Sequence, residues 1–314
     1  MPQNAIETTN LVKRFGEFTA VDGINLKIRR GELFGFLGPN GAGKTTTIRM
    51  LTTLTSPTSG KAVVAGFDVA DEPSEVRAKI GVVPQAFSLF EELTPLENLW
   101  YIGKLNGMKD SEIRPRSEEL LKTVTLFDKR DVKTGGFSGG MKQRMSVAAG
   151  LLHEPEILFM DEPTTGLDPQ SRIALRDLTG ELNKDHGITI VYTTHDMEEA
   201  DKLCHRIAIM DHGSIIALGS SSELKQEVSE SGIIDVNAPG VPDGVVKKLK
   251  TVPSVRSVER VGDNLLIRTA KMKDAFCDLP AFFRDQKQEI LGIRQQNVSL
   301  EDVFIKLTSR KLRD

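Results

Sequence analysis

Apolar and polar residues alternate near the start of the chain, and this alternation predicts strands. Ile24, Leu26 and Ile28 are separated by single polar residues and precede the turn at 29–31. Residues 1–37 are therefore expected to consist mainly of strands. Further along, residues 61–69 have the same character and predict a strand or hairpin, followed by a short helix at 75–79.

Several later apolar runs lack this alternation. Residues 156–160 are almost continuously apolar, which is typical of a strand buried on both faces of a parallel sheet. Residues 80–84 and 189–194 predict further strands, separated by helices that include one at 170–183. The runs at 207–210 and 214–218 flank Asp211-His212-Gly213 and predict a hairpin, and a helix is expected at 222–230.

Apolar residues recur at helical spacing between 86 and 134, so this segment is predicted to be helical and semi-independent. Thr94 is placed to cap a helix whose first residue is Pro95. The expected apolar stripes consist of Leu96, Leu99, Trp100 and Leu105 in one helix and Leu120, Leu121, Val124 and Leu126 in another. Such stripes usually belong to a core rather than to an interface, and both are assigned to the core.

The pattern changes after residue 230. Two apolar segments pair around Gly262-Asp263-Asn264, and the order of elements predicts a small β-α-β-β-α-β domain of the split βαβ kind. A final helix begins with a capping box from Ser299 to Asp302. Its apolar face, with Leu300 and Phe304, could support a dimer, although packing within its own domain is favoured.

The sequence thus predicts two domains. Residues 1–230 form an α/β domain with a helical subdomain at about 86–140, and residues 231–314 form a small α+β domain.

Composition excludes some classes of function but does not identify the function. The 314 residues have a formal net charge of -3, which provides no basic field for nucleic acid. No apolar run reaches about 18 residues, so nothing in the sequence is predicted to span a bilayer. The polar N-terminus suggests no signal peptide. Cys204 and Cys277 lack metal-ligand spacing, and each is expected to be a free, buried thiol in a reducing compartment.

One stretch between a predicted strand and a predicted helix carries a phosphate-binding pattern. Residues 38–45 fit G-x-x-x-x-G-K-[ST] without a gap. The predicted binding residues are Gly38, Pro39, Asn40, Gly41, Ala42, Gly43, Lys44, Thr45 and the following Thr46. Glycines let several backbone N–H groups face one anion, and the helix N-terminus adds partial positive charge. Lys44 is assigned to the β- and γ-phosphates and the Thr45 hydroxyl to Mg²⁺, so ATP or GTP is the expected ligand.

Two carboxylates follow the apolar run at 156–160, where ligands bind in parallel sheets. Phosphoryl chemistry needs one acid that holds Mg²⁺ through water and another that orients the attacking water. Asp161 suits the first role and Glu162 the second. Gln85 follows another strand, and its amide oxygen can reach Mg²⁺ or a water. By itself, however, a glutamine at a strand end is usually an ordinary polar residue.

Four further sites are ambiguous when each is considered alone. Ser138-Gly139-Gly140 opens a helix and offers a second anion site, but the same residues form a common helix cap. His195 ends a strand and could donate to a γ-phosphate. Phe15 could stack on a base or simply pack in the core. Asp168 lies in the turn that leads into the helix at 170–183.

Taken together and in order, these motifs resemble those of the ATP-binding-cassette (ABC) ATPases. The match covers roughly residues 5–225, and the signature Ser138-Gly139-Gly140 is its most specific part because other P-loop families lack it. The resemblance implies ATP and Mg²⁺ as ligands. It also implies that Phe15 stacks on the base and that His195 senses the γ-phosphate.

The same resemblance implies an assembly. Two copies would face head to tail when ATP binds, as a homodimer or as a heterodimer with a second ABC ATPase. Each nucleotide would lie between the P-loop of one copy and Ser138 and Gly140 of the other. Asp168 would link the two sites across the interface.

Within the family, the whole chain resembles the ATPase subunit of a type-2 exporter of the daunorubicin-resistance kind. Residues 93–99, 141–144 and 298–304 support this assignment, although they are less specific than the signature. The resemblance implies a polytopic membrane permease as partner, contacted through residues 86–134. It places the chain at the cytoplasmic face of the cell membrane, held there by the permease.

Two other functions are weaker. A soluble ABC ATPase acting on nucleic acid or ribosomes would resemble tandem cassettes or cassettes split by long coiled coils, and no heptad run separates Lys44 from Asp161. A regulatory module with a degenerate site is weaker still, because every expected polar residue is present.

Overall fold

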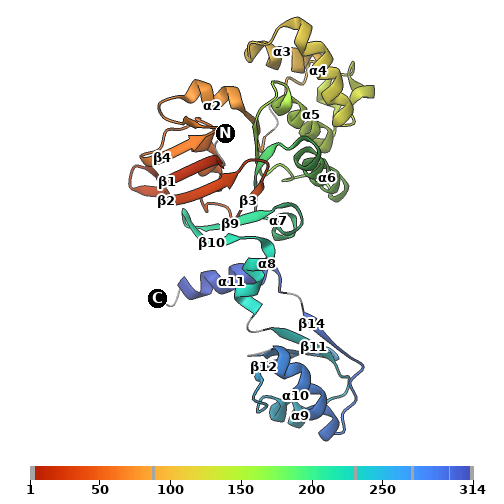
Figure 1. Ribbon diagram of the computed structural model, residues 1–314. Coiled ribbons are helices and arrows are strands. Elements are labelled where there is room, and N and C mark those ends of the chain that lie inside the picture. The colour runs from red at the N-terminus through yellow and green to blue at the C-terminus, as the bar shows by residue number, and fades with distance from the viewer. Residues whose placement is uncertain (1–3, 87–88, 230–231, 270–271, 297, 312–314) are drawn as a thin grey trace. The chain divides into compact units, whose positions relative to one another are not determined.

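The chain folds into two compact units (Figure 1). The computed structural model describes residues 4–86, 89–229, 232–269, 272–296 and 298–311. The first unit is Met1–Ser220 and the second is Ser221–Asp314. The second unit therefore begins with helix α8 (Ser221–Ser229), whereas the sequence analysis placed this helix in the first domain.

A six-stranded sheet forms the centre of the first unit, with the strand order β10-β9-β3-β8-β7-β6. Its strands are β3 (Leu33–Leu37), β6 (Ile80–Val83), β7 (Ile157–Asp161), β8 (Thr189–Thr194), β9 (Arg206–Asp211) and β10 (Ser214–Gly219). All neighbours are parallel except β10, which forms the predicted hairpin with β9. Every residue of β3, β7 and β8 is buried, as their apolar composition predicts.

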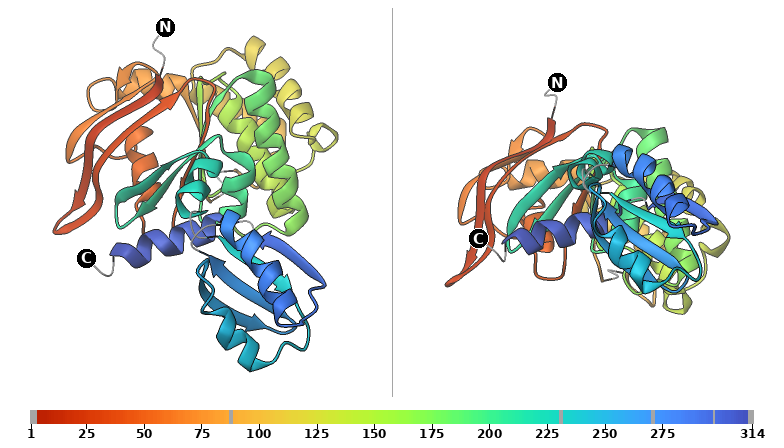
Figure 2. Two further views of the ribbon diagram at one scale, coloured as in Figure 1. Left: turned by 60° about the horizontal axis from the view of Figure 1, so that its bottom comes forward. Right: turned by 90° about the horizontal axis from the view of Figure 1, so that it is seen from below.

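A second sheet of the first unit is antiparallel and has the order β2-β1-β4-β5. It consists of β1 (Asn4–Phe15), β2 (Phe18–Arg29), β4 (Ser59–Val64) and β5 (Phe67–Asp68). The long strands β1 and β2 form a twisted ribbon (Figure 2). Ile24, Leu26 and Ile28 are buried, which confirms the alternation read from the sequence.

Seven α-helices lie in the described part of the first unit. They are α1 (Lys44–Leu51), α2 (Pro73–Lys79), α3 (Pro95–Leu105), α4 (Asp110–Thr123), α5 (Gly139–Leu151), α6 (Pro169–His186) and α7 (Met197–Leu203). Short 3₁₀ turns lie at Phe127–Lys129 and Thr134–Gly136. The predicted cap of α3 is confirmed: Thr94 Oγ1 accepts from the Glu97 N–H over 3.3 Å, and Pro95 is the first helical residue.

Only part of the α3 stripe belongs to the core. Leu99 is buried, but Trp100 and Leu105 are 49% and 71% exposed, so their assignment to the core was wrong. Helix α3 contacts α4 and α5 through the side that holds Leu99 and Gly103. Trp100 and Leu105 lie about 100° or more around the helix from Leu99 and miss that side. The second stripe is buried as predicted, at Leu120, Leu121, Val124 and Leu126.

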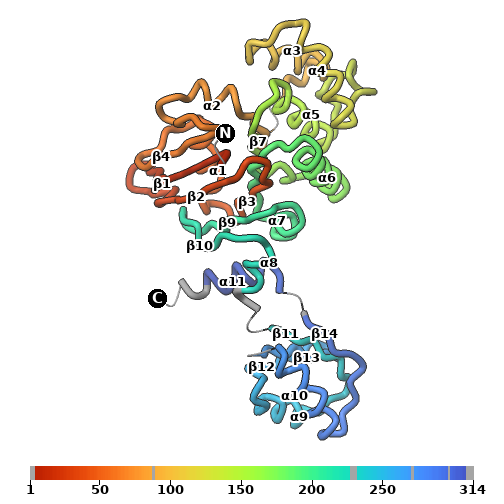
Figure 3. The backbone as a smooth tube through the Cα atoms, in the orientation of Figure 1, coloured from red at the N-terminus to blue at the C-terminus, as the bar shows by residue number. Residues whose placement is uncertain are grey.

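The second unit contains the predicted β-α-β-β-α-β order (Figure 3). Its elements are β11 (Ile233–Asn237), α9 (Asp243–Leu249), β12 (Val255–Val261), β13 (Asn264–Thr269), α10 (Met272–Asp285) and β14 (Gly292–Gln296). The antiparallel sheet has the order β12-β13-β11-β14. Its core includes Ile234, Ile267, Leu279 and Phe283.

Helix α11 (Leu300–Lys311) closes the described chain and packs against α8 of the same unit. Ser299 Oγ accepts from the Asp302 N–H over 3.1 Å, which confirms the predicted capping box. Leu300 and Val303 are buried, in agreement with packing inside the unit.

The two cysteines lie in different surroundings. Cys204 is buried and free, as expected, but Cys277 is exposed, so its assignment as a buried thiol was wrong. Ala275, Leu279 and Phe283 form the buried face of α10 at intervals of four residues, and Cys277 falls on the opposite side of that stripe.

Candidate nucleotide site

The parallel sheet brings the predicted catalytic residues to one edge. Strands β3, β8, β7 and β6 are consecutive neighbours, and the phosphate loop at 38–45 follows β3. His195 follows β8, Glu162 follows β7, and Gln85 lies shortly after β6. Because all four strands are parallel, their carboxyl ends meet at the same edge, where α/β folds bind ligands.

Close packing fixes the phosphate loop and requires its glycines. A Cβ at Gly38 would lie 2.3 Å from the Met210 carbonyl oxygen. Gly43 has a φ of 102°, and a Cβ there would lie 2.6 Å from the Ala20 carbonyl oxygen. Helix α1 begins at Lys44, so the N–H groups of its first turn have no acceptor within the helix and can face an anion.

Lys44 is almost fully buried at the start of α1. Its Nζ donates to the carbonyl oxygens of Gly38, over 2.7 Å, and Pro39, over 3.1 Å. The same ammonium lies 3.1 Å from Glu162 Oε1. The charge of the phosphate loop is thus in direct contact with the acid that follows β7.

Asp161 lies at the centre of an oxygen-rich cluster. Its Oδ1 accepts a hydrogen bond from Thr45 Oγ1 over 3.1 Å and another from Thr193 Oγ1 over 2.7 Å. Carboxylate and hydroxyl oxygens are the ligands that Mg²⁺ prefers, so these side chains fit the ion assigned to them from the sequence. Thr193 was missed by the sequence analysis, because nothing local distinguishes it from other strand threonines.

Glu162 joins the phosphate loop to the end of β8. Its Oε2 accepts from Thr165 Oγ1 over 3.2 Å and lies 3.1 Å from His195 Nδ1. Burial raises the pKa of Glu162, but the hydrogen bond and charge of Lys44 outweigh it, with help from His195, so the pKa lies below its ordinary value. Glu162 therefore carries a negative charge at neutral pH.

A cavity of about 340 Å³ lies over the phosphate loop. It is lined by Phe18, Ala20, Asn40, Gly41, Ala42, Gly43, Lys44, Thr45, Thr46, Gln85 and Glu162. The structure thus brings most of the predicted residues together, including the distant Gln85.

The aromatic that lines this cavity is Phe18 and not the predicted Phe15. Phe15 pairs with Phe18 across the β1–β2 hairpin, and the Lys13 ammonium lies 5.0 Å from the centre of its ring. Both rings are more than half exposed. Phe18 could have been found from the sequence as the aromatic next to Phe15 on the returning strand.

The signature residues lie outside this cavity. Ser138 is exposed and caps α5, where its hydroxyl accepts from the Met141 N–H over 3.3 Å. A Cβ at Gly140 would lie 2.3 Å from Ser171 Oγ, so this glycine permits the close approach of α5 and α6. Within one copy, the structure does not bring the signature to the phosphate loop.

Asp168 is exposed and caps α6. Its Oδ1 accepts from the N–H groups of Gln170, over 3.1 Å, and Ser171, over 3.0 Å. Hydrogen bonds from Ser171 and Gln170 hold the pKa of Asp168 below its ordinary value. Like the signature, Asp168 does not line the cavity over the phosphate loop.

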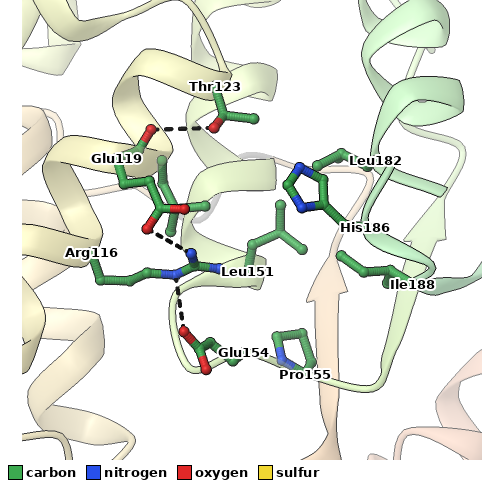
Figure 4. A pocket seen from close by; sticks show the side chains of 10 residues that line it. Arg116, Glu119, Thr123, Leu151, Glu154, Pro155, Leu182, His186 and Ile188 are labelled. Carbon is green, nitrogen blue, oxygen red and sulfur yellow. Dashed lines mark hydrogen bonds and ion pairs between the residues drawn. The ribbon is translucent and has the colours of Figure 1, made fainter. Parts of the chain in front are cut away.

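A second cavity, of about 200 Å³, lies between α4 and the carboxyl ends of α5 and α6 (Figure 4). Arg116 spans it, with Nη1 2.8 Å from Glu119 and Nε 3.7 Å from Glu154. None of its lining residues was singled out as a candidate for chemistry. We interpret it as a packing gap between helices α4, α5 and α6, braced by Arg116.

Comparison with known proteins identifies the family. A family model described as ABC transporter matches residues 21–165. The linearmycin resistance ATP-binding protein of Bacillus subtilis (strain 168) is 37% identical over 98% of this chain and all of its own length. The Nod factor export ATP-binding protein I of Paraburkholderia xenovorans (strain LB400) is 38% identical, with both chains fully covered.

The chain belongs to the ABC transporter ATPases.

Other relatives place this ABC ATPase among exporters. The daunorubicin/doxorubicin resistance ATP-binding protein of Streptomyces peucetius is 46% identical over 73% of this chain and 69% of its own. The chain is the ATP-hydrolysing subunit of an ABC-2 type exporter. These relatives offer no support for a role on nucleic acid or ribosomes. No helix in the described residues of this ABC ATPase is long and apolar enough to cross a membrane.

Solved structures confirm the fold. The dimeric cassette MJ0796, solved in a post-hydrolysis state with ADP and Pi, is 31% identical and has a TM-score of 0.62, covering 68% of this ABC ATPase and 98% of the cassette. A second neighbour, cbiO1 of Clostridium perfringens, has a TM-score of 0.66 at 28% identity, covering 79% and 95% of the two chains.

Proposed function

We propose that this subunit hydrolyses ATP at the cavity over the phosphate loop, with Glu162 as the general base. The observation that carries the proposal is the position of the Glu162 carboxylate, in contact with Lys44 on one side and His195 on the other. Both contacts keep Glu162 ionised and aimed at the cavity. A carboxylate held in this way can orient a water and accept its proton.

The residues of the phosphate loop bind the triphosphate. Lys44 supplies the mobile positive charge, and the N–H groups from Gly41 to Thr46 supply hydrogen bonds. His195 contacts the γ-phosphate through the imidazole edge that does not face Glu162. The tip of the β1–β2 ribbon contacts the base through an aromatic ring: Phe18 lines the cavity, and Phe15 is its partner across the hairpin.

Mg²⁺ is held by Thr45, Asp161 and Gln85. When bound, it neutralises negative charge that builds up on the phosphate oxygens. The support is the oxygen cluster around Asp161 Oδ1 and the position of Gln85 at the rim of the same cavity.

The site is completed by a second copy of the chain or by another ABC ATPase. Ser138, Gly139 and Gly140 lie at the N-terminus of α5, away from the phosphate loop of their own copy, and Ser138 is exposed. In a head-to-tail dimer this helix end contacts the nucleotide of the partner, and Asp168 lies at the interface. The dimeric state of the solved relative supports this arrangement.

The partner in the membrane is a separate polytopic permease at the cytoplasmic face. The surface of the helical subdomain supports this part of the proposal, because α3 exposes Trp100 and Leu105 among polar residues. Aromatic residues are enriched in protein interfaces relative to the rest of the surface, which favours the helix that exposes Trp100 as the docking site. The relatives named for export and resistance support export as the direction.

The variant Glu162→Gln tests this function. It keeps the size of the side chain and removes its basicity, so steady-state ATP hydrolysis should fall by at least about a hundredfold. ATP should remain bound, and the ATP-loaded variant should migrate as a stable dimer in size-exclusion chromatography. Hydrolysis that continued at the wild-type rate would exclude Glu162 as the base.

A further inference from the structure

Glu199 is a buried carboxylate next to the loops that carry Glu162 and His195. It lies in the first turn of α7, and only 3% of its surface is exposed. Burying a charged group is unfavourable unless hydrogen bonds or opposite charges compensate it. The groups that compensate the buried charge of Glu199 therefore indicate what this residue does.

Two of these groups lie close in the chain to the proposed catalytic residues. Thr164 Oγ1 donates to Glu199 Oε2 over 2.9 Å, and Thr194 Oγ1 donates to the same oxygen over 3.1 Å. Thr164 lies two residues after Glu162, and Thr194 directly precedes His195. One carboxylate oxygen thus connects the loop after β7 to the end of β8.

A third hydroxyl reaches the same oxygen from inside the sheet. The Tyr192 hydroxyl donates to Glu199 Oε2 over 3.3 Å. Burial, together with the charge of Glu199, raises the pKa of Tyr192 well above its ordinary value, so its hydroxyl remains a donor. Hydrogen bonds to an ionised acceptor are roughly twice as strong as neutral ones.

The other oxygen of Glu199 faces a cation. Arg172 Nε lies 3.8 Å from Glu199 Oε1, and neither atom has a hydrogen bond. Arg172 Nη1 donates to Asp196 over 3.1 Å, and Asp196 caps α7 by accepting from the Glu199 N–H over 3.2 Å. The N–H of Arg172 also donates to the Asp168 carbonyl oxygen over 3.0 Å. Arg172 therefore braces Glu199 from the first turn of α6.

We propose that Glu199 is a positioning residue that sets the distance between Glu162 and His195. It acts through Thr164 and Thr194 and does not touch the reacting atoms. The 3.1 Å contact between Glu162 Oε2 and His195 Nδ1 joins the segment after β7 to the segment after β8. Glu199 Oε2 accepts a hydrogen bond from a residue next to each of these segments, Thr164 on one side and Thr194 on the other. This inference rests on the catalytic roles proposed above for these two residues.

The variant Glu199→Gln tests the proposal in the full chain. It keeps the shape of the side chain but removes its charge. The amide oxygen accepts more weakly from the three converging hydroxyls, and the amide nitrogen takes the place of the oxygen that faces Arg172. The kcat for ATP should fall about tenfold, because small displacements of catalytic groups are costly. The KM for ATP and the amount of ATP bound should change less than about twofold, because the phosphate loop is untouched. A kcat within twofold of the wild-type value would overturn the proposal.

Variants at Thr164 separate positioning from support of the fold. Thr164→Val removes the hydroxyl and should lower kcat as Glu199→Gln does, whereas Thr164→Ser keeps the hydroxyl and should recover most of the wild-type rate. The double variant Glu199→Gln/Thr164→Val should lose less activity than the product of the two single losses, because both changes act on the same link. If the two changes lowered kcat independently, so that the two fold-losses multiplied in the double variant, this link would be contradicted.

Tyr192→Phe is the matched control. It removes the third hydroxyl from the same oxygen but leaves both loop contacts in place, so it should lower thermal stability without changing kcat. If it lowered kcat as much as Glu199→Gln does, Glu199 would support the fold only, and the proposal would fail. Inactivity of Glu162→Gln together with normal turnover of Glu199→Gln would overturn this inference and leave the proposed function intact.

Discussion

At the scale of single residues, the feature that organises the site is the contact between Lys44 and Glu162. Both side chains are buried, and the two charged atoms lie 3.1 Å apart. The two residues come from different elements, after β3 and after β7, and meet only because the sheet places those strand ends together. Removing one member of such a pair leaves a buried charge without compensation.

From this contact we predict how the stability of the protein depends on pH. Because the folded pKa of Glu162 lies below its ordinary 4.5, its contribution to stability is complete above that value and is lost as the pH falls through the folded pKa. At pH 7, Glu162→Gln should lower the free energy of unfolding by about 1–3 kcal/mol. Below about pH 4.5 the difference between the two proteins should shrink. Urea unfolding followed by the fluorescence of Trp100, the single tryptophan, measures both values. A difference that did not change with pH would contradict the ion pair.

Functional residues can be predicted from the sequence where the pattern that identifies them is local. The phosphate loop was found because glycines, lysine and threonine occur at fixed spacing between a strand and a helix. Thr193 and Glu199 were missed because their roles come from neighbours that are distant in the chain. Glu199 is typical: its partners Thr164 and Arg172 lie on elements about thirty residues upstream, so no local pattern reveals them.

At the scale of elements, the contact between α5 and α6 depends on a single glycine. A Cβ at Gly140 would lie 2.3 Å from Ser171 Oγ and 2.6 Å from Ser171 Cβ, which is too close for any side chain. Gly140→Ala should therefore lower the free energy of unfolding by about 1–3 kcal/mol. Gly136→Ala is the matched control, because a Cβ there would meet nothing within 4 Å and should change stability by less than about 0.5 kcal/mol. Equal urea midpoints for the two variants would contradict the packing account.

Helix α3 makes a second prediction at this scale. Leu105→Lys should abolish co-purification with the permease after mild detergent extraction, while leaving ATP hydrolysis by the isolated subunit unchanged. Leu54→Lys is the control: Leu54 is 70% exposed, against 71% for Leu105, but lies after α1 and outside the helical subdomain. Equal retention of the permease by both variants would exclude this part of α3 as the docking surface.

Helices and strands could be predicted from the sequence more reliably than the elements that cover each of their sides. The β-α-β-β-α-β order was correct because each element carries its own periodicity and turn signals. The errors at Trp100 and Leu105 have a common cause. Periodicity shows that a helix has an apolar side, but the width of the buried side depends on which elements cover it, and only the tertiary structure shows that.

At the scale of the whole molecule, the division into units follows helix packing and not composition. Helix α8 belongs with α11, and its Leu224 is 1% exposed. A chain truncated after Ser220 should remain monodisperse and bind ATP, because it keeps the whole first unit. A chain truncated after residue 230 retains α8 without α11 and should aggregate, because Leu224 loses its cover. Light scattering on both chains measures this, and identical behaviour would contradict the division at residue 220.

In the proposed dimer, each ATP site is built from the phosphate loop of one copy and the signature of another. The most direct test is the ATPase rate of an equimolar mixture of Lys44→Ala and Ser138→Arg chains. Each variant alone should be inactive, since both sites of its homodimer lack one half. The mixture should recover about a quarter of the wild-type rate, because half of the dimers are mixed and each contains one intact site. A mixture as inactive as its two components would contradict the account.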